Sequence, residues 1–233
     1  MSVLLTSHRK SCVLAIGAHP DDVVISVGGT LAQLSDAGHP VVILTLSSGE
    51  AGGIAAHREA EELDAARQLG AQVEFGRLPD SEITMRPAIR AIDRALARYQ
   101  PDIVLVHSAQ DTHQDHIVAS EAANVSCRRV PTLLGYESPS SQFFQPTMVM
   151  DVTDVWDRKL RAAKAHASQV ASGRLLAWID AVGRYRAWPR HVGGFCEGLR
   201  VCHAEALPLL SARQLASASD AGATLSMVHA HVS

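Results

Sequence analysis

Apolar runs that alternate with helical patterns organise the first two thirds of the chain. The runs at 13–16, 41–46, 103–106 and 132–136 are typical of strands covered on both faces, and a shorter strand is expected at 72–75. Helical patterns lie between these runs, at 28–34, 55–69, 86–99 and 117–127. This alternation predicts an α/β fold that is Rossmann-like, with a mostly parallel sheet and helices on both faces.

The pattern changes after Pro146. A further strand is expected at 147–152, a helix at 154–170 and another helix at 175–184, which together form a C-terminal α/β extension. We expect residues 1–207 to form a single domain. Residues 208–233 are rich in Ala and Ser, and we expect a loosely ordered tail there.

The composition narrows the class of protein. The chain has 233 residues, of which 47% are hydrophobic and 19% charged, with a net charge of −3, so it is an ordinary globular chain without the basic surface of a nucleic-acid binder. We find no apolar run as long as the ~20 residues of a membrane span, and no signal peptide. The four cysteines show no CxxC spacing, which favours a reducing cytoplasm.

Two polar motifs follow two of the expected strands. Ala18-His19-Pro20-Asp21-Asp22 follows the first strand, and His113-Gln114-Asp115-His116 follows the fourth. Ligands bind open α/β sheets at the carboxyl ends of the strands, where the strand order reverses. The two motifs, although far apart in sequence, are therefore expected to meet in one crevice.

The residue types in these motifs suit a metal ion. His19, Asp22 and His116 offer two imidazoles and one carboxylate, which leaves a position open for water. Zn²⁺ suits this set, and Fe²⁺ or Mn²⁺ would also be tolerated. A single histidine beside a strand is more often a packed or exposed side chain, but the combination of both motifs favours metal-assisted hydrolysis.

Several segments resemble the PIG-L/LmbE-like family of zinc-dependent de-N-acetylases. The resemblance rests on the two motifs and on Gly28-Gly29-Thr30, Arg58-x-x-Glu61 and Leu69-Gly70, with later likenesses at 136–141, 164–169 and 195–201. It covers about residues 12–202. It implies that His19, Asp22 and His116 hold one zinc ion, that Asp21 is the general base, and that His113 stabilises the oxyanion or protonates the leaving amine.

For other residues, a role in the site is expected only because they lie near the motifs in sequence or because the family resemblance implies it. Asp115 or Asp111 is expected to orient an imidazole from behind, although Asp111 could equally be a solvated loop carboxylate. Arg58 alone would be a solvated helix residue paired with Glu61 or Glu62, whereas the resemblance implies a contact with a sugar hydroxyl or phosphate.

Some histidines and some departures from the family pattern remain without a function. His166 matches the family's HxSQ segment, and we assign it no role beyond packing near the site; His107, His191 and His203 receive none. The family carries a glutamate at one of the positions that Val23 and Val24 occupy here. This departure affects substrate preference more than metal binding.

The sequence thus predicts a zinc-dependent enzyme that cleaves a linear amide C–N bond. The expected substrate is a small molecule containing N-acetylglucosamine, whose acetamide yields acetate and a free amine. The resemblance also implies a homo-oligomer, a trimer or hexamer. Two alternatives stay open: a metal-dependent phosphoesterase, in which Asp111 and Asp115 would hold a second ion, and a non-catalytic Rossmann-like protein that binds a sugar or nucleotide. The chain lacks the Gly-x-Gly-x-x-Gly turn of dinucleotide-binding domains, which counts against the second alternative.

Overall fold

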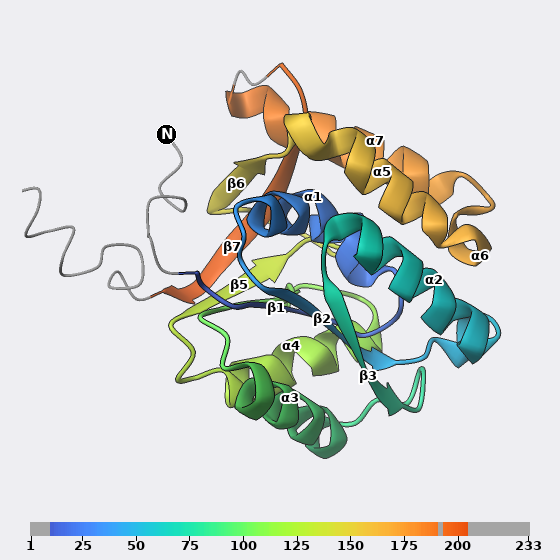
Figure 1. Ribbon diagram of the computed structural model, residues 1–233, viewed down its shortest axis with the longest axis vertical. Helices are drawn as coiled ribbons and strands as arrows, with labels where there is room; N and C mark the ends of the chain where they lie inside the picture. Colours follow the sequence, from blue (N-terminus) through green and yellow to red (C-terminus); the bar gives the residue numbers. More distant parts are fainter. Residues whose placement is uncertain (1–9, 191–192, 205–233) are drawn as a thin grey trace, which may run out of the picture. The chain divides into compact units, whose positions relative to one another are not determined.

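The fold is built on one seven-stranded sheet. The computed structural model describes residues 10–190 and 193–204, and Lys10–Ala204 form one compact unit. The strand order is β3-β2-β1-β4-β5-β7-β6 (Figure 1). The strands are β1 (Val13–Gly17), β2 (Val41–Ser47), β3 (Gln72–Leu78), β4 (Ile103–His107), β5 (Thr132–Tyr136), β6 (Met148–Asp151) and β7 (Cys196–Ala204).

Helices cover both faces of this sheet. They are α1 (Asp22–Asp36), α2 (Ala55–Leu69), α3 (Met85–Tyr99), α4 (Gln114–Ser126), α5 (Trp156–Ala165), α6 (Ala167–Val170) and α7 (Arg174–Ala187), with short 3-10 segments at Glu50–Gly52, Thr153–Val155 and Trp188–Arg190. α3 and α4 cover one face, whereas α1, α2, α5 and α7 lie on the other (Figure 1). None of the helices in the described part of the chain has the length and apolar composition to cross a membrane.

Strand pairing explains where the two motifs lie. β1 pairs in parallel with β2 on one side and with β4 on the other. After β1 the chain continues to β2 and β3 on one side of the sheet, and after β4 it continues to β5 on the other side. β1 is buried along its whole length, as its apolar sequence predicts for an interior parallel strand. The switch in direction places the residues after β1 and after β4 at the same edge. The predicted fold class is confirmed.

Three elements differ most from the prediction. The helix expected at 28–34 already begins at Asp22 and is kinked at Val27, where φ is −130°. The helix expected at 154–170 ends at Ala165, because His166 has ψ 56° and starts the separate helix α6. β7 was not predicted: Glu197, Gly198 and Arg200 interrupt its apolar residues, so the segment lacks the continuous apolar run of a buried strand, and four of its last five residues are exposed. The expected tail at 208–233 lies outside the described residues.

Candidate metal and catalytic site

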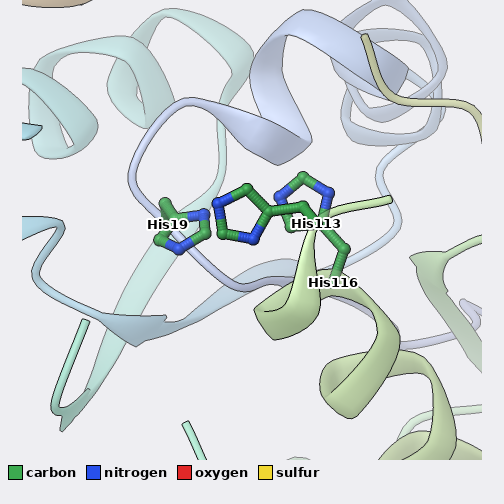
Figure 2. Close-up of side chains that lie close together, drawn as sticks. All are labelled: His19, His113 and His116. Carbon is green, nitrogen blue, oxygen red and sulfur yellow. The ribbon is translucent and has the colours of Figure 1, made fainter. Parts of the chain in front are cut away.

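Three histidine rings from the two motifs lie close together. His19 comes from the loop after β1, while His113 and His116 come from the start of α4, and their rings lie side by side (Figure 2). The ring centroids are 4.7 Å apart for His19 and His113, 5.4 Å for His19 and His116, and 4.5 Å for His113 and His116. Segments that are distant in sequence therefore meet at the sheet edge predicted for them.

Asp22 lies between two of these rings. Its Oδ2 is 3.3 Å from His19 Nδ1, and its Oδ1 is 3.3 Å from His116 Nε2. The backbone N–H of His19 also donates to Asp22 Oδ2, at 2.8 Å, which fixes the carboxylate in the turn after Pro20. Asp22 thus links His19 and His116, with one carboxylate oxygen near each ring.

A carboxylate lies behind each of the two histidines. His19 Nε2 is 3.1 Å from Asp115 Oδ2 and 3.0 Å from Asp80 Oδ1, while His116 Nδ1 is 3.2 Å from Asp111 Oδ2. This arrangement orients each ring so that its other nitrogen faces Asp22, as in carboxylate–histidine–metal sites. Asp111 also accepts hydrogen bonds from Ser138 and Ser141, so the reading of Asp111 as a solvated loop carboxylate is wrong.

The donor set fits a divalent cation. Burial lowers the pKa of His19, but hydrogen bonds to Asp115 and Asp22 outweigh it and raise the pKa to about 10. For His116, burial is likewise outweighed, by the charges of Asp22 and Asp111, and the pKa rises to about 9. These carboxylates therefore stabilise positive charge at the two rings, and a mixture of imidazole and carboxylate ligands is what zinc binds in proteins.

Three combinations of described residues bring ligand atoms within 4.8 Å of one another. They are His19–His113–His116, Asp22–His107–His116 and His19–Asp80–Asp115. The predicted trio of His19, Asp22 and His116 is instead linked pairwise through Asp22. The first combination shares His19 with the third and His116 with the second, whereas the second and third have no residue in common.

Asp21 lies beside this site with a different electrostatic environment. Its side chain is buried, and burial together with the charge of Asp22 raises the pKa of Asp21 to about 7, against the opposing effect of Arg58. Asp22 is also buried, but the neighbouring rings of His116 and His107 hold its pKa well below the usual value. Two adjacent carboxylates therefore differ in their affinity for a proton.

His113 is held as a neutral ring at the N-terminus of α4. Its Nδ1 accepts a hydrogen bond from the backbone N–H of Asp115 at 3.2 Å, and its own backbone N–H donates to Asp111 at 2.8 Å. Burial, followed by the charges of His116 and His19, lowers the pKa of His113. In a neutral ring whose Nδ1 accepts, the proton is on Nε2, which leaves that nitrogen as a donor.

These residues line one cavity of about 500 Å³. The predicted residues in its wall are His19, Asp21, Asp22, Arg58, His113 and His116. Asp80, Ile25, Gln169 and Leu175 complete other parts of the wall. The volume is typical of a pocket for a small molecule.

Arg58 is buried in this wall, with 5% of its surface exposed, so its interpretation as a solvated helix residue is wrong. Its guanidinium donates to Pro20 O at 2.7 Å and to Gly49 O at 2.8 Å, and it lies 3.6 Å from Asp21 Oδ1. Arg58 therefore holds the loop that carries Asp21.

Three residues of the site were missed by sequence reasoning. His107, the last residue of β4, stacks on His116 with ring centroids 3.8 Å apart. Asp80 follows β3 at the same edge of the sheet. Both positions could have been found from their place at the ends of strands. Glu62 accepts a hydrogen bond from the N–H of Asp21 at 3.0 Å from the middle of α2, and no sequence pattern indicates this contact.

The sequence of this chain is similar to those of a protein family and of several known proteins. The family model described as GlcNAc-PI de-N-acetylase (PIG-L) matches residues 14–126. The uncharacterized deacetylase YaiS of Escherichia coli K12 is 33% identical over 179 residues, which are 72% of this chain and 96% of YaiS. The diacetylchitobiose deacetylase of Thermococcus kodakarensis is 31% identical over 188 residues, covering 67% of this chain and 69% of the relative.

One further relative is named as a hydratase, which is another class of enzyme. A solved structure supports the fold. The 4-oxalmesaconate hydratase of Pseudomonas putida is 28% identical over 199 residues, covering 71% of this chain and 76% of the hydratase. The conserved protein TT1542 of Thermus thermophilus superposes with a TM-score of 0.74 at 26% identity, covering 84% of this chain and 96% of that one. The match to the family model and the extent of the likeness to YaiS show that this chain belongs to the PIG-L family of de-N-acetylases.

Proposed function

We propose that the chain is a zinc-dependent N-deacetylase that hydrolyses the acetamide of a small molecule containing N-acetylglucosamine, releasing acetate and a free amine. The observation that carries this proposal is the convergence of His19, Asp21, Asp22, His113 and His116 in the wall of one cavity. Such a site combines ligands for a cation with a base and a hydrogen-bond donor, which hydrolysis of an unactivated amide requires.

His19 Nδ1, Asp22 and His116 Nε2 are the atoms that we assign to the zinc ion. Asp115 and Asp111 fix the two rings from behind. When bound, zinc supplies a Lewis acid that polarises the amide carbonyl and lowers the pKa of water. Fe²⁺ or Mn²⁺ would suit the same donors.

Asp21 is assigned as the general base. A carboxylate whose pKa is raised to about 7 exchanges a proton readily near neutral pH, as an efficient base must. Arg58 lies 3.6 Å from the Asp21 carboxylate and holds the preceding carbonyl of Pro20, so Asp21 is kept at the cavity wall. Asp21 takes the proton of the attacking water and can pass it to the leaving amine.

His113 is assigned as the donor that stabilises the tetrahedral oxyanion. Its neutral ring carries a proton on Nε2, since Nδ1 accepts from Asp115 N–H. A neutral donor that is fixed before the reaction stabilises developing negative charge without first having to reorient.

The proposal is tested by incubating the zinc-loaded protein with N-acetylated glycosides and measuring acetate and free amine. Acetate with an equal amount of amine, at one zinc per chain, supports it. Release of phosphate with two ions per chain would favour a phosphoesterase. Tight binding of the sugar without release of acetate would favour a binding protein, and addition of water to an unsaturated acid would favour a hydratase. Each of these results contradicts the proposal.

Two further expectations concern the protein in the cell. No disulfide bond joins the four cysteines, all of which lie in the described part of the chain, and Cys202 is exposed; we therefore propose a reducing cytoplasm as the compartment. A homo-oligomer, a trimer or hexamer, remains a proposal from the resemblance, and light scattering coupled to size exclusion would test it.

A further inference from the structure

The backbone of Asp21 has a conformation that L-amino acids rarely adopt. Its φ is 108° and its ψ is −34°, and it precedes α1 without a hydrogen bond from its own side chain to the helix. Such a conformation persists only where neighbouring groups hold it. Without this support the backbone would relax, and the carboxylate assigned as the base would point elsewhere.

Glu62 makes the contact that can hold this conformation. Its Oε2 accepts the backbone N–H of Asp21 at 3.0 Å, and the side chain is 1% exposed. Arg58 lies one turn earlier on α2 and binds the carbonyl of Pro20 at 2.7 Å. One helix face therefore holds both the C=O and the N–H of the peptide group that joins Pro20 to Asp21.

His166 closes the other side of Glu62. It is fully buried at the junction of α5 and α6, and its Nε2 lies 3.3 Å from Glu62 Oε2. The hydroxyl of Thr45 lies 3.5 Å from the other carboxylate oxygen. Packed between Thr45, His166 and the Asp21 amide, Glu62 has little freedom to move away from Asp21.

We infer that Glu62, backed by His166, is a positioning residue that fixes the Asp21 backbone and thereby aims its carboxylate into the cavity. This inference rests on the proposed function for the role of Asp21. Glu62 itself is not in the cavity wall, so it acts through Asp21 and does not touch the substrate.

A matched pair of variants tests the inference. Glu62→Gln keeps an oxygen that can accept the Asp21 N–H, whereas Glu62→Met keeps a similar volume without that acceptor. Misplacing a catalytic group by about 1 Å costs roughly 100-fold in rate, so we expect Glu62→Met to lower kcat by about that factor at unchanged KM and zinc content. Glu62→Gln should stay within about 3-fold of the wild type, because the amide oxygen replaces the acceptor. Asp64 is an exposed carboxylate on the same helix, and Asp64→Asn is the control.

Crystal structures of both variants supply a readout that does not depend on activity. We expect Asp21 to keep its positive φ in Glu62→Gln and to lose it in Glu62→Met. Unchanged φ and kcat in Glu62→Met would overturn the inference, as would a loss of zinc or a change confined to KM. If the wild type deacetylates no substrate but φ still changes as expected, the positioning role stands and the proposed function fails.

Discussion

Asp21 and Asp22 show how two identical neighbours acquire different properties. The imidazoles of His116 and His107 hold the pKa of Asp22 well below its usual range, which suits a carboxylate that must stay ionised to bind a cation. Asp21 is buried beside the negative charge of Asp22, and both effects raise its pKa to about 7. Separate pKa values in adjacent groups are the pattern expected when one is a ligand and the other a base.

This difference leads to a prediction for Asp21→Asn. The amide cannot accept the proton of water, so we expect kcat to fall by about 10²- to 10⁴-fold while zinc content stays at one per chain. Steady-state kinetics and elemental analysis of the same preparation measure both quantities. Asp36→Asn, at the exposed end of α1, is the control and should retain full activity. Near-normal turnover of Asp21→Asn would remove Asp21 as the base.

A second prediction separates His116 from His113, although both lie within reach of a shared ion. His116→Ala removes an assigned ligand, and we expect the purified protein to contain little zinc. His113→Ala removes a hydrogen-bond donor, and we expect zinc to remain while kcat falls by about 10²- to 10³-fold. Equal zinc loss in both variants would show that His113 is also a ligand.

The residues of the site were predictable to the extent that they follow strand ends in short motifs. His19, Asp21, Asp22, His113 and His116 were all named from the sequence and share one cavity. Their individual roles stay predictions. Glu62 could not be found, because its importance arises from the packing of α2 against the loop after β1, which leaves no local pattern. Val24, one of the two positions at which the family resemblance implies a glutamate, packs in an apolar cluster with Ala65 and Leu69.

At the scale of elements, a buried ion pair stabilises the kink of α1. Glu197 on β7 accepts hydrogen bonds from the N–H groups of Gly29 and Thr30, just after the kink at Val27, and from Lys159 Nζ at 2.6 Å. Both charged side chains are 3% exposed. The kinked segment thus obtains from β7 the acceptors that its own backbone lacks.

Removing one partner of this pair should destabilise the protein strongly. We expect Glu197→Ala to lower the free energy of unfolding by about 3–5 kcal/mol, because it leaves the Lys159 ammonium buried without its partner. Adding Lys159→Met should recover part of the loss. Urea denaturation measures both, with Asp36→Ala as a control that breaks the more exposed Arg158 pair and should cost at most about 1 kcal/mol. A loss below that of Asp36→Ala would contradict this account.

The buried carboxyl of α2 gives a pH dependence of stability. Burial raises the pKa of Glu62 from 4.5 to about 8, so between these values the folded protein holds a proton that the unfolded chain lacks. Stability is therefore lost as the pH rises through this window, by at most about 1.4 kcal/mol per pH unit. Glu62→Gln has no such proton to lose.

We therefore expect Glu62→Gln to gain stability relative to the wild type as the pH rises from 5 to 8. Urea denaturation of the metal-free proteins at several pH values measures this difference. For Asp64→Asn, on the exposed side of α2, the difference from the wild type should stay nearly constant. A constant difference for Glu62→Gln as well would mean that Glu62 is ionised in the folded protein.

At the scale of the whole molecule, the sequence predicted the α/β class because buried parallel strands are nearly continuous apolar runs. β1, β2, β4 and β5 were found in this way, and their order brings the motifs together. The C-terminal part was predicted less well. β7 is antiparallel and half exposed, and the break between α5 and α6 at His166 depends on contacts with α2 that sequence periodicity does not record.

The account depends on one cation held between His19, Asp22 and His116. The most direct measurement is anomalous diffraction at the zinc edge from crystals of the zinc-loaded protein. We predict a single zinc peak per chain, bound by His19 Nδ1, Asp22 and His116 Nε2, with Asp115 and Asp111 behind the two rings. A peak between His19, Asp80 and Asp115, or no peak near these histidines, would contradict the account.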